Sequence, residues 1–284
     1  MSGAHNIHKT PRTGIQMKRC ALILRGAAAG LTWAAFWAPP VVRAAPPLWR
    51  IEETVEDDRK DEITLVVRPD AKAVGDSAIV LTPVAVENYV RAHPALASAT
   101  RAVCRTEAGR ALVTAEMPKD RRVEPEVDGE RAEMAVGPSL AEAPPGVAID
   151  PAQQSHRQAP EAIRVAAVLE AAEALIGTPL AWGADPASGY CDPATFVAAV
   201  YRKALGYRLP ATLDGLWAET GVSVPVWDLR PGDLVLLDRG ELVGIYLGAD
   251  EIAACDPAAG EVVRLNVGPT SGLTARIADV RRLF

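Results

Sequence analysis

The order of secondary-structure patterns after residue 160 is the feature that most limits how this chain can fold. An Ala-rich helical pattern runs over 162–176 and ends before Gly177. A second helix is predicted to begin at Pro193, since Asp192 is a favourable N-cap residue and Gly206 a favourable stop. The apolar residues of this second helix share one face: Phe196, Val197, Val200, Tyr201 and Leu205.

Four short β runs follow the two helices. They cover 234–237, 243–247, 252–255 and 262–267, and turn-forming residues separate them. Consecutive short strands joined by tight turns usually pair as an antiparallel meander. The sequence therefore predicts an α+β domain over 160–284, in which helices pack on an antiparallel sheet.

The preceding region, 46–118, is predicted to be a small α+β domain of unknown type. Residues 63–67 are a β-branched run, periodic apolar residues over 84–93 predict a short helix ending near His93, and polarity alternates on both sides of 107–109 as in a hairpin. Six prolines and eight acidic residues between positions 119 and 160 mark 119–159 as a linker. Alternatively, this stretch packs as an irregular part of the first domain.

The first 45 residues have the pattern of a targeting segment. They contain six basic residues and no acidic residue, and an apolar stretch over 26–42 is shorter than the roughly 20 residues of a membrane-spanning helix. Small residues at Val42 and Ala44 suit a signal peptidase. We expect 1–45 to be a signal peptide, with translation starting at Met1 or Met17; an uncleaved anchor is the alternative.

Removal of this segment would change the charge balance of the protein. The remaining chain holds 24 basic and 36 acidic residues, a formal net charge of −12. Such an acidic protein is a poor partner for nucleic acid or anionic lipid. We therefore expect an exported, periplasmic or extracellular protein that does not bind nucleic acid and has no stable membrane insertion after signal cleavage.

Several motifs of the carboxy-terminal domain occur together in a recognisable order. Trp182-Gly183 is followed by the string Pro-Gly-Asp-Leu at 231–234 and by Val-Gly-Ile-Tyr-Leu-Gly at 243–248. Over 160–284 the chain resembles the NlpC/P60 family, whose members are papain-like cysteine peptidases that cut the peptide stems of peptidoglycan. The resemblance implies a papain-like fold for this domain.

The residues that carry out catalysis in that family are absent from the matching positions. The family's nucleophile is a Cys at a helix amino terminus, where Pro193 stands here; its base matches Leu242, and its orienting residue matches Ala254. The Tyr that commonly precedes Trp-Gly matches Leu180. All four histidines, His5, His8, His93 and His156, precede the domain. No catalytic residue, metal site or cofactor is therefore expected.

Cys191 is the one alternative nucleophile, two positions before the expected place. It could act in the cleft after a loop shift, pack inward as a small apolar residue, or pair with Cys255. Without a histidine in the domain, acyl transfer would lack a proton donor for the leaving amine.

Three functions remain open on the sequence alone. The first is an exported pseudoenzyme that binds a peptidoglycan stem peptide or an envelope protein, with Trp182, Tyr190 and Asp192 as candidate ligand-binding residues. The second is an active peptidoglycan endopeptidase that uses Cys191. The third is a structural envelope module with no small ligand.

Overall fold

The computed structural model describes residues 46–57, 61–96, 98–117, 144–145, 147–150, 156–238 and 241–284. All of them belong to one compact unit, Arg43–Phe284. The predicted signal peptide and most of the predicted linker lie outside the described residues, so both stay predictions. Within the described residues, no helix is long and apolar enough to cross a membrane.

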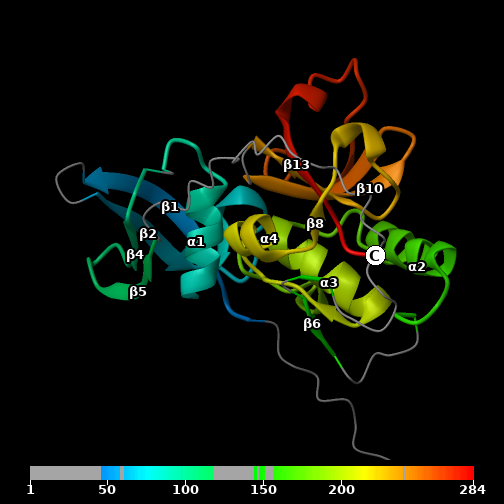
Figure 1. Ribbon diagram of the computed structural model, residues 1–284. Coiled ribbons are helices and arrows are strands. Elements are labelled where there is room, and N and C mark those ends of the chain that lie inside the picture. The colour runs from blue at the N-terminus through cyan, green and yellow to red at the C-terminus, as the bar shows by residue number, and fades with distance from the viewer. Residues whose placement is uncertain are drawn as a thin grey trace, which may run out of the picture. The chain divides into compact units, whose positions relative to one another are not determined.

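A five-stranded sheet forms the amino-terminal region, with strand order β3-β1-β2-β4-β5 (Figure 1). Its elements are β1 (Leu48–Asp57), β2 (Glu62–Pro69), η1 (Gly75–Ser77), β3 (Ala78–Val80), α1 (Pro83–Arg91), β4 (Arg101–Arg105) and β5 (Ala111–Glu116). Neighbouring strands are antiparallel except β2 and β4, which run parallel. The predicted strand at 63–67, the helix at 84–93 and the hairpin around 107–109 are confirmed.

The carboxy-terminal region combines helices with a six-stranded sheet of order β12-β11-β10-β9-β13-β8. Its helices are α2 (Glu161–Glu173), η2 (Pro186–Ser188), α3 (Pro193–Leu205), α4 (Leu213–Glu219), η3 (Val226–Asp228) and η5 (Thr274–Arg276). Its strands are β8 (Val222–Ser223), β9 (Leu234–Leu237), β10 (Leu242–Gly248), β11 (Glu251–Asp256), β12 (Glu261–Asn266) and β13 (Ile277–Arg282). A separate short pair joins β6 (Ala148–Ile149) to β7 (Tyr207–Arg208). The predicted α+β class and the meander β9 to β12 are confirmed.

Local sequence explains where α3 begins and ends. Asp192 and Thr195 form a capping box, in which each side chain accepts a hydrogen bond from the other's backbone N–H. Pro193 takes the first helical position. At the other end Gly206 adopts φ 71°, a left-handed conformation that favours glycine. These contacts fix the amino terminus of α3 against the loop before it.

The two faces of the carboxy-terminal sheet pack into different apolar clusters. Alternate residues of β10 and β11 face the main core, which also contains the apolar face of α3: Val243, Ile245, Ala253 and Cys255. The residues between them belong to a second cluster: Leu242, Tyr246, Ile252 and Ala254. The main core also includes residues of the amino-terminal region, such as Val86 and Leu96.

Candidate functional site

Asp192, the N-cap residue of α3, lies at the centre of a buried set of hydrogen bonds. Its Oδ1 accepts from the backbone N–H of Thr195 at 2.7 Å, and its Oδ2 accepts from the N–H of Gly183 at 2.8 Å and from Nδ2 of Asn88 at 3.0 Å. Burial raises the pKa of this carboxyl, and the three hydrogen bonds oppose that rise. Pro193, the next residue, is buried and has no nucleophilic atom.

Asn88 reaches this position from α1 of the amino-terminal region. Its Nδ2 also donates to the carbonyl oxygen of Ala211 at 3.0 Å, and its Oδ1 accepts from the N–H of Leu213 at 3.4 Å. Only 1% of Asn88 is exposed. One amide side chain therefore joins α1, the start of α3 and the start of α4.

Trp182 is completely buried beneath the same region. Its backbone N–H donates to Ala78 O and its carbonyl accepts from the N–H of Val80, both at 2.8 Å, so the loop before α3 pairs with β3. Its indole Nε1 donates to both Oδ1 and the backbone oxygen of Asp76 at 3.1 Å. The indole therefore has no free face or free donor for a ligand.

His93 lies against Trp182, with ring centroids 5.8 Å apart. Its Nε2 contacts Asp76 Oδ2 at 2.8 Å and its Nδ1 contacts the carbonyl oxygen of Tyr89 at 2.5 Å. Both partners are acceptors, so both ring nitrogens need a proton. Burial works against the charged ring, but the bonds to Asp76 and Tyr89 prevail and raise the pKa of His93.

Of the other candidate residues, Cys191 directly precedes Asp192, whereas Tyr190, Leu242 and Ala254 lie in other apolar clusters. Tyr190 is half-buried and packs beside a small apolar cluster of the amino-terminal strands and the loop before α3. Cys191 is completely buried, with its Sγ 3.5 Å from Sγ of Cys255 on β11. Leu242 and Ala254 belong to the second cluster, while Cys191 belongs to the main core. Trp182 and Asp192 therefore lie close together, since Gly183, the residue after Trp182, donates to Asp192. Leu242 and Ala254, which match the family's base and orienting residue in the sequence, lie in a different apolar cluster.

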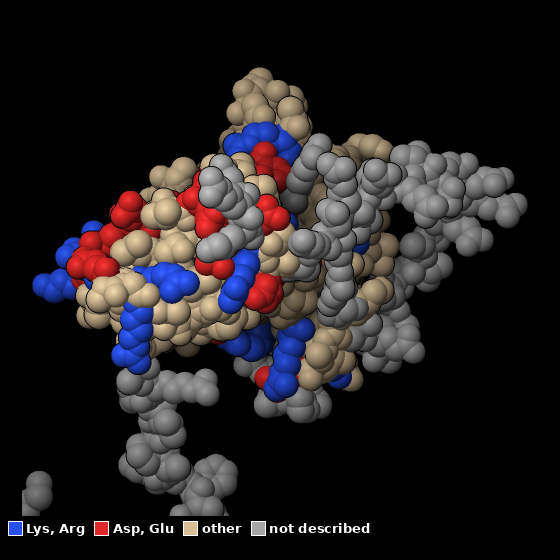
Figure 2. Space-filling view, turned by 90° about the vertical axis from the view of Figure 1, so that its left-hand side faces the viewer, with Lys and Arg blue, Asp and Glu red and all other residues tan. Residues whose placement is uncertain are grey.

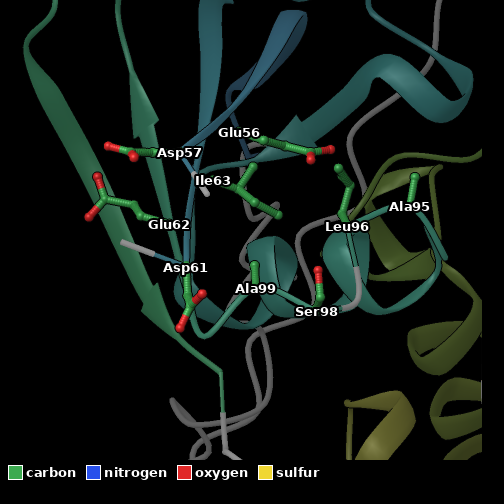
Figure 3. Close-up of a pocket in the computed structure, with 9 residues that line it drawn as sticks. All are labelled: Glu56, Asp57, Asp61, Glu62, Ile63, Ala95, Leu96, Ser98 and Ala99. Carbon is green, nitrogen blue, oxygen red and sulfur yellow. The ribbon is translucent and has the colours of Figure 1, made fainter. Parts of the chain in front are cut away.

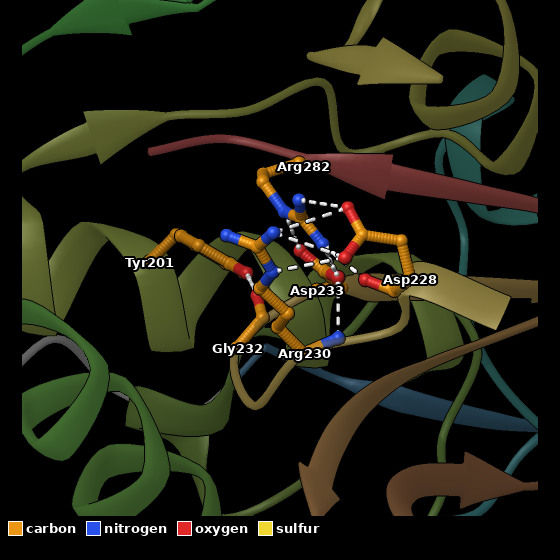
Figure 4. A network of polar contacts seen from close by, with 6 residues as sticks. All are labelled: Tyr201, Asp228, Arg230, Gly232, Asp233 and Arg282. Carbon is orange, nitrogen blue, oxygen red and sulfur yellow. Dashed lines mark hydrogen bonds and ion pairs between the residues drawn. The ribbon is translucent and has the colours of Figure 1, made fainter. Parts of the chain in front are cut away.

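The string Pro-Gly-Asp-Leu has a structural role in this molecule. Asp233 accepts from Nε of Arg282 at 2.9 Å, from Nη2 of Arg282 at 2.8 Å and from the N–H of Arg230 at 2.8 Å (Figure 4). Asp228 binds both arginines, which lowers the pKa of its carboxyl. The hydroxyl of Tyr201 donates to the carbonyl of Gly232. This network joins α3, the turn before β9 and β13.

A shallow acidic hollow lies at one end of β1 and β2. Its carboxylates come from Glu56, Asp57, Asp61 and Glu62, and they point in different directions instead of converging (Figure 3). Glu62 is paired with Arg101 at 3.4 Å. Across the described residues, no group of three or more His, Cys, Asp or Glu side chains could hold a metal ion.

Charges of both signs are interspersed on the face of the molecule shown in Figure 2. Ion pairs among the described residues include Arg101 with Glu116 at 3.2 Å and Arg50 with Asp70 at 2.9 Å. This face therefore presents no continuous basic surface of the kind that binds a phosphate backbone.

Comparison with known proteins identifies the carboxy-terminal region. Residues 177–280 match the model of the NlpC/P60 family. No curated protein matches the chain significantly. Solved structures similar to it include the peptidoglycan hydrolase RipB from Mycobacterium tuberculosis, at 23% identity over 43% of this chain and 67% of that one, with a TM-score of 0.36.

Two further structures show the range of proteins similar to this chain. RipD from Mycobacterium tuberculosis, described as a non-catalytic NlpC/p60 domain protein adapted to peptidoglycan binding, is 18% identical over 43% of this chain and 98% of that one, with a TM-score of 0.36. An NlpC/P60 family protein from Bacillus cereus is 22% identical over 42% of this chain, with a TM-score of 0.38. The match spans only 40% of that longer protein.

Proposed function

Since residues 177–280 form an NlpC/P60-type domain, we propose that this protein is an exported, catalytically inactive member that binds peptidoglycan or an envelope protein through a surface other than the family's groove. The observation that carries this proposal is the buried hydrogen bond from Asn88 on α1 to Asp192, the residue directly before Pro193. We propose 46–118 and 160–284 as the two functional regions, with the former covering the latter's groove.

The proposal of inactivity rests on the side chains at the matching positions. Pro193 has no atom that can attack a carbonyl, and Leu242 and Ala254 have no atom that can accept a proton. His93 packs against Trp182 near the start of α3, and acceptor oxygens contact both of its ring nitrogens. Cys191 is completely buried, and its Sγ contacts Sγ of Cys255.

The proposal of a different binding surface rests on burial at the candidate residues. Trp182 and Asp192 are both 0% exposed, and their polar atoms already have partners within the chain. A stem peptide would have to displace α1 and leave Asn88 and Asp192 without their hydrogen bonds, which costs about 1–3 kcal/mol for each orphaned group. A ligand on another surface meets no such cost.

Export is proposed from the amino-terminal segment and from the family. The segment 1–45 has basic residues, an apolar stretch and small residues in the order of a secretory signal. Peptidoglycan and envelope proteins are available to a protein only after export. The similarity of the carboxy-terminal region to cell-wall proteins is therefore consistent with that signal.

Sedimentation with purified peptidoglycan tests the binding half of the proposal. We expect the full chain to appear in the pellet, and we expect Tyr190→Ala, a change at the half-buried candidate residue in the loop before α3, to sediment equally. Absence of the wild-type chain from the pellet would remove peptidoglycan as the ligand. Loss of sedimentation in Tyr190→Ala alone, with unchanged stability, would show that the groove itself is the binding surface.

A further inference from the structure

Two buried thiols meet at the base of the carboxy-terminal domain. Cys191 immediately precedes the N-cap residue of α3, and Cys255 lies on β11, 64 positions further along the chain. Their Sγ atoms are 3.5 Å apart, and Sγ of Cys255 also donates to the backbone oxygen of Cys191 at 3.4 Å. The two side chains therefore point directly at each other.

The surroundings hold these two residues in place. The N–H of Cys191 donates to Pro179 O at 3.1 Å and its carbonyl accepts from Ala181 N–H at 3.0 Å, while Cys255 pairs with Val262 inside the sheet. Both thiols are 0% exposed. Backbone bonding on both sides leaves side-chain rotation as the movement available to the sulfurs.

We propose that Cys191 and Cys255 form a structural disulfide in the mature protein. A disulfide has a sulfur–sulfur distance of about 2.05 Å, so each sulfur has to move by only about 0.7 Å from its present position. An exported protein matures in a compartment where such bonds persist. The bond links the loop before α3 to β11 and closes a long stretch of chain that contains α3 and α4.

The reaction is a pair of thiol–disulfide exchanges. The thiolate of one cysteine attacks a sulfur of an oxidant disulfide, such as oxidised glutathione, and releases one reduced thiol. The second cysteine then attacks the protein sulfur of the mixed disulfide and releases the second reduced thiol. The two cysteines lose two protons and two electrons in total, and the oxidant disulfide is reduced to two thiols.

The disulfide forms while the protein folds, before the two thiols are buried. In the folded chain the hydrogen bond to Cys191 and burial raise the pKa of Cys255, so a thiolate is rare there and no oxidant reaches it. Before the core closes, both thiols are accessible. Once formed, the bond is shielded from reductants and removes Cys191 as a nucleophile.

Cys104 provides an internal control, because it lies on β4 of the other sheet. Burial raises the pKa of its thiol to about 12. Among the described residues, Cys104 is a buried free cysteine. It is expected to remain a thiol in the same sample in which the other two are oxidised.

Thiol counting on the full chain tests the proposal. The unfolded chain is refolded with reduced and oxidised glutathione, denatured again, and alkylated with iodoacetamide before mass spectrometry of its peptides. We expect alkylation at Cys20 and Cys104 and a cross-linked peptide that contains Cys191 and Cys255. Alkylation of all four cysteines, or cross-links that involve Cys104 as often as Cys191, would overturn it.

Cysteine variants and Tm measurements test whether the Cys191–Cys255 disulfide is specific or forms by chance. Cys104→Ala should keep the cross-linked peptide, whereas Cys255→Ala should yield alkylated Cys191 and no substitute bond. Reduction under denaturing conditions followed by refolding without oxidant should lower the Tm of the wild type by several degrees and leave that of Cys255→Ala unchanged. An equal shift in both proteins would contradict a structural bond. None of these readouts depends on catalytic activity or on export.

Discussion

Nδ2 of Asn88 donates a hydrogen bond to Oδ2 of Asp192 across 104 positions of sequence, at 3.0 Å and with both side chains buried. This bond connects α1 of the amino-terminal region to the start of α3 in the NlpC/P60-type domain. The amino terminus of α3 is therefore a structural contact between the two regions in this protein. Its residues stabilise the packing of the two regions.

Asn88→Ala should destabilise the protein by about 3 kcal/mol, because it leaves the Ala211 carbonyl and the Leu213 N–H unpaired and removes one partner of Asp192. Urea denaturation measures the effect. Val84→Ala, an exposed change on the same helix, is the control and should cost under about 1 kcal/mol. Equal stabilities of the two variants would show that the amide contributes nothing.

Gly183→Ala should destabilise by about 3 kcal/mol or more, because an added Cβ would lie 2.2 Å from Cβ of Ala85 on α1. Gly189→Ala is a matched control, since its φ of +85° is similar to the +74° of Gly183 but open space surrounds its Cβ position. The control should cost about 1–2 kcal/mol. Adding Ala85→Gly to Gly183→Ala should recover part of the loss, and an unchanged loss would contradict the contact.

Stability should depend on the protonation of His93. Its pKa is raised above the ordinary value of 6.5, so its contribution is complete below about pH 6 and is lost as pH rises through the folded pKa. The free energy of unfolding should therefore fall between about pH 6 and pH 8 more in the wild type than in His93→Gln. Identical slopes in the wild type and in His93→Gln would contradict a charged His93.

Arg282→Ala should cost about 3–5 kcal/mol, because it leaves the buried carboxylate of Asp233 without its guanidinium partner. Arg264→Ala provides the comparison, since Arg264 is half-exposed and pairs at the surface with Glu173 and Glu251. That change should cost about 1 kcal/mol or less. Thermal unfolding of both variants checks the difference. Similar losses of stability would show that the buried Arg282–Asp233 pair contributes no more than the surface pairs of Arg264.

The sequence predicted the elements whose signals are local. The N-cap Asp192 with Pro193 and the stop at Gly206 marked both ends of α3, and short β runs with turn residues marked β9 to β12. Strand β13 was missed, since it enters the sheet between β9 and β8 and no neighbouring strand in the sequence indicates that pairing. Helix α4 was also missed, although Thr212 is an N-cap residue that accepts from Gly215 N–H.

The contacts around Asp192 and Trp182 could not be predicted from the sequence. A single Asn on the face of a helix has no pattern that indicates a partner 104 positions away. His93 was expected at a helix end, where it lies, but its contact with Trp182 depends on how β3 pairs with the loop before α3. The sequence also suggested Trp182, Tyr190 and Asp192 as ligand-binding residues; because Trp182 and Asp192 are 0% exposed, the proposed function places the ligand on another surface.

Release of muropeptides from purified peptidoglycan tests the central proposal, a catalytically inactive NlpC/P60-type domain, most directly. The full-length wild type and Cys191→Ser are incubated with the same peptidoglycan, and soluble fragments are quantified against buffer alone and against an active peptidoglycan endopeptidase. The account predicts that neither protein releases fragments above buffer. Release by the wild type that disappears in Cys191→Ser would contradict it and would establish Cys191 as a working nucleophile.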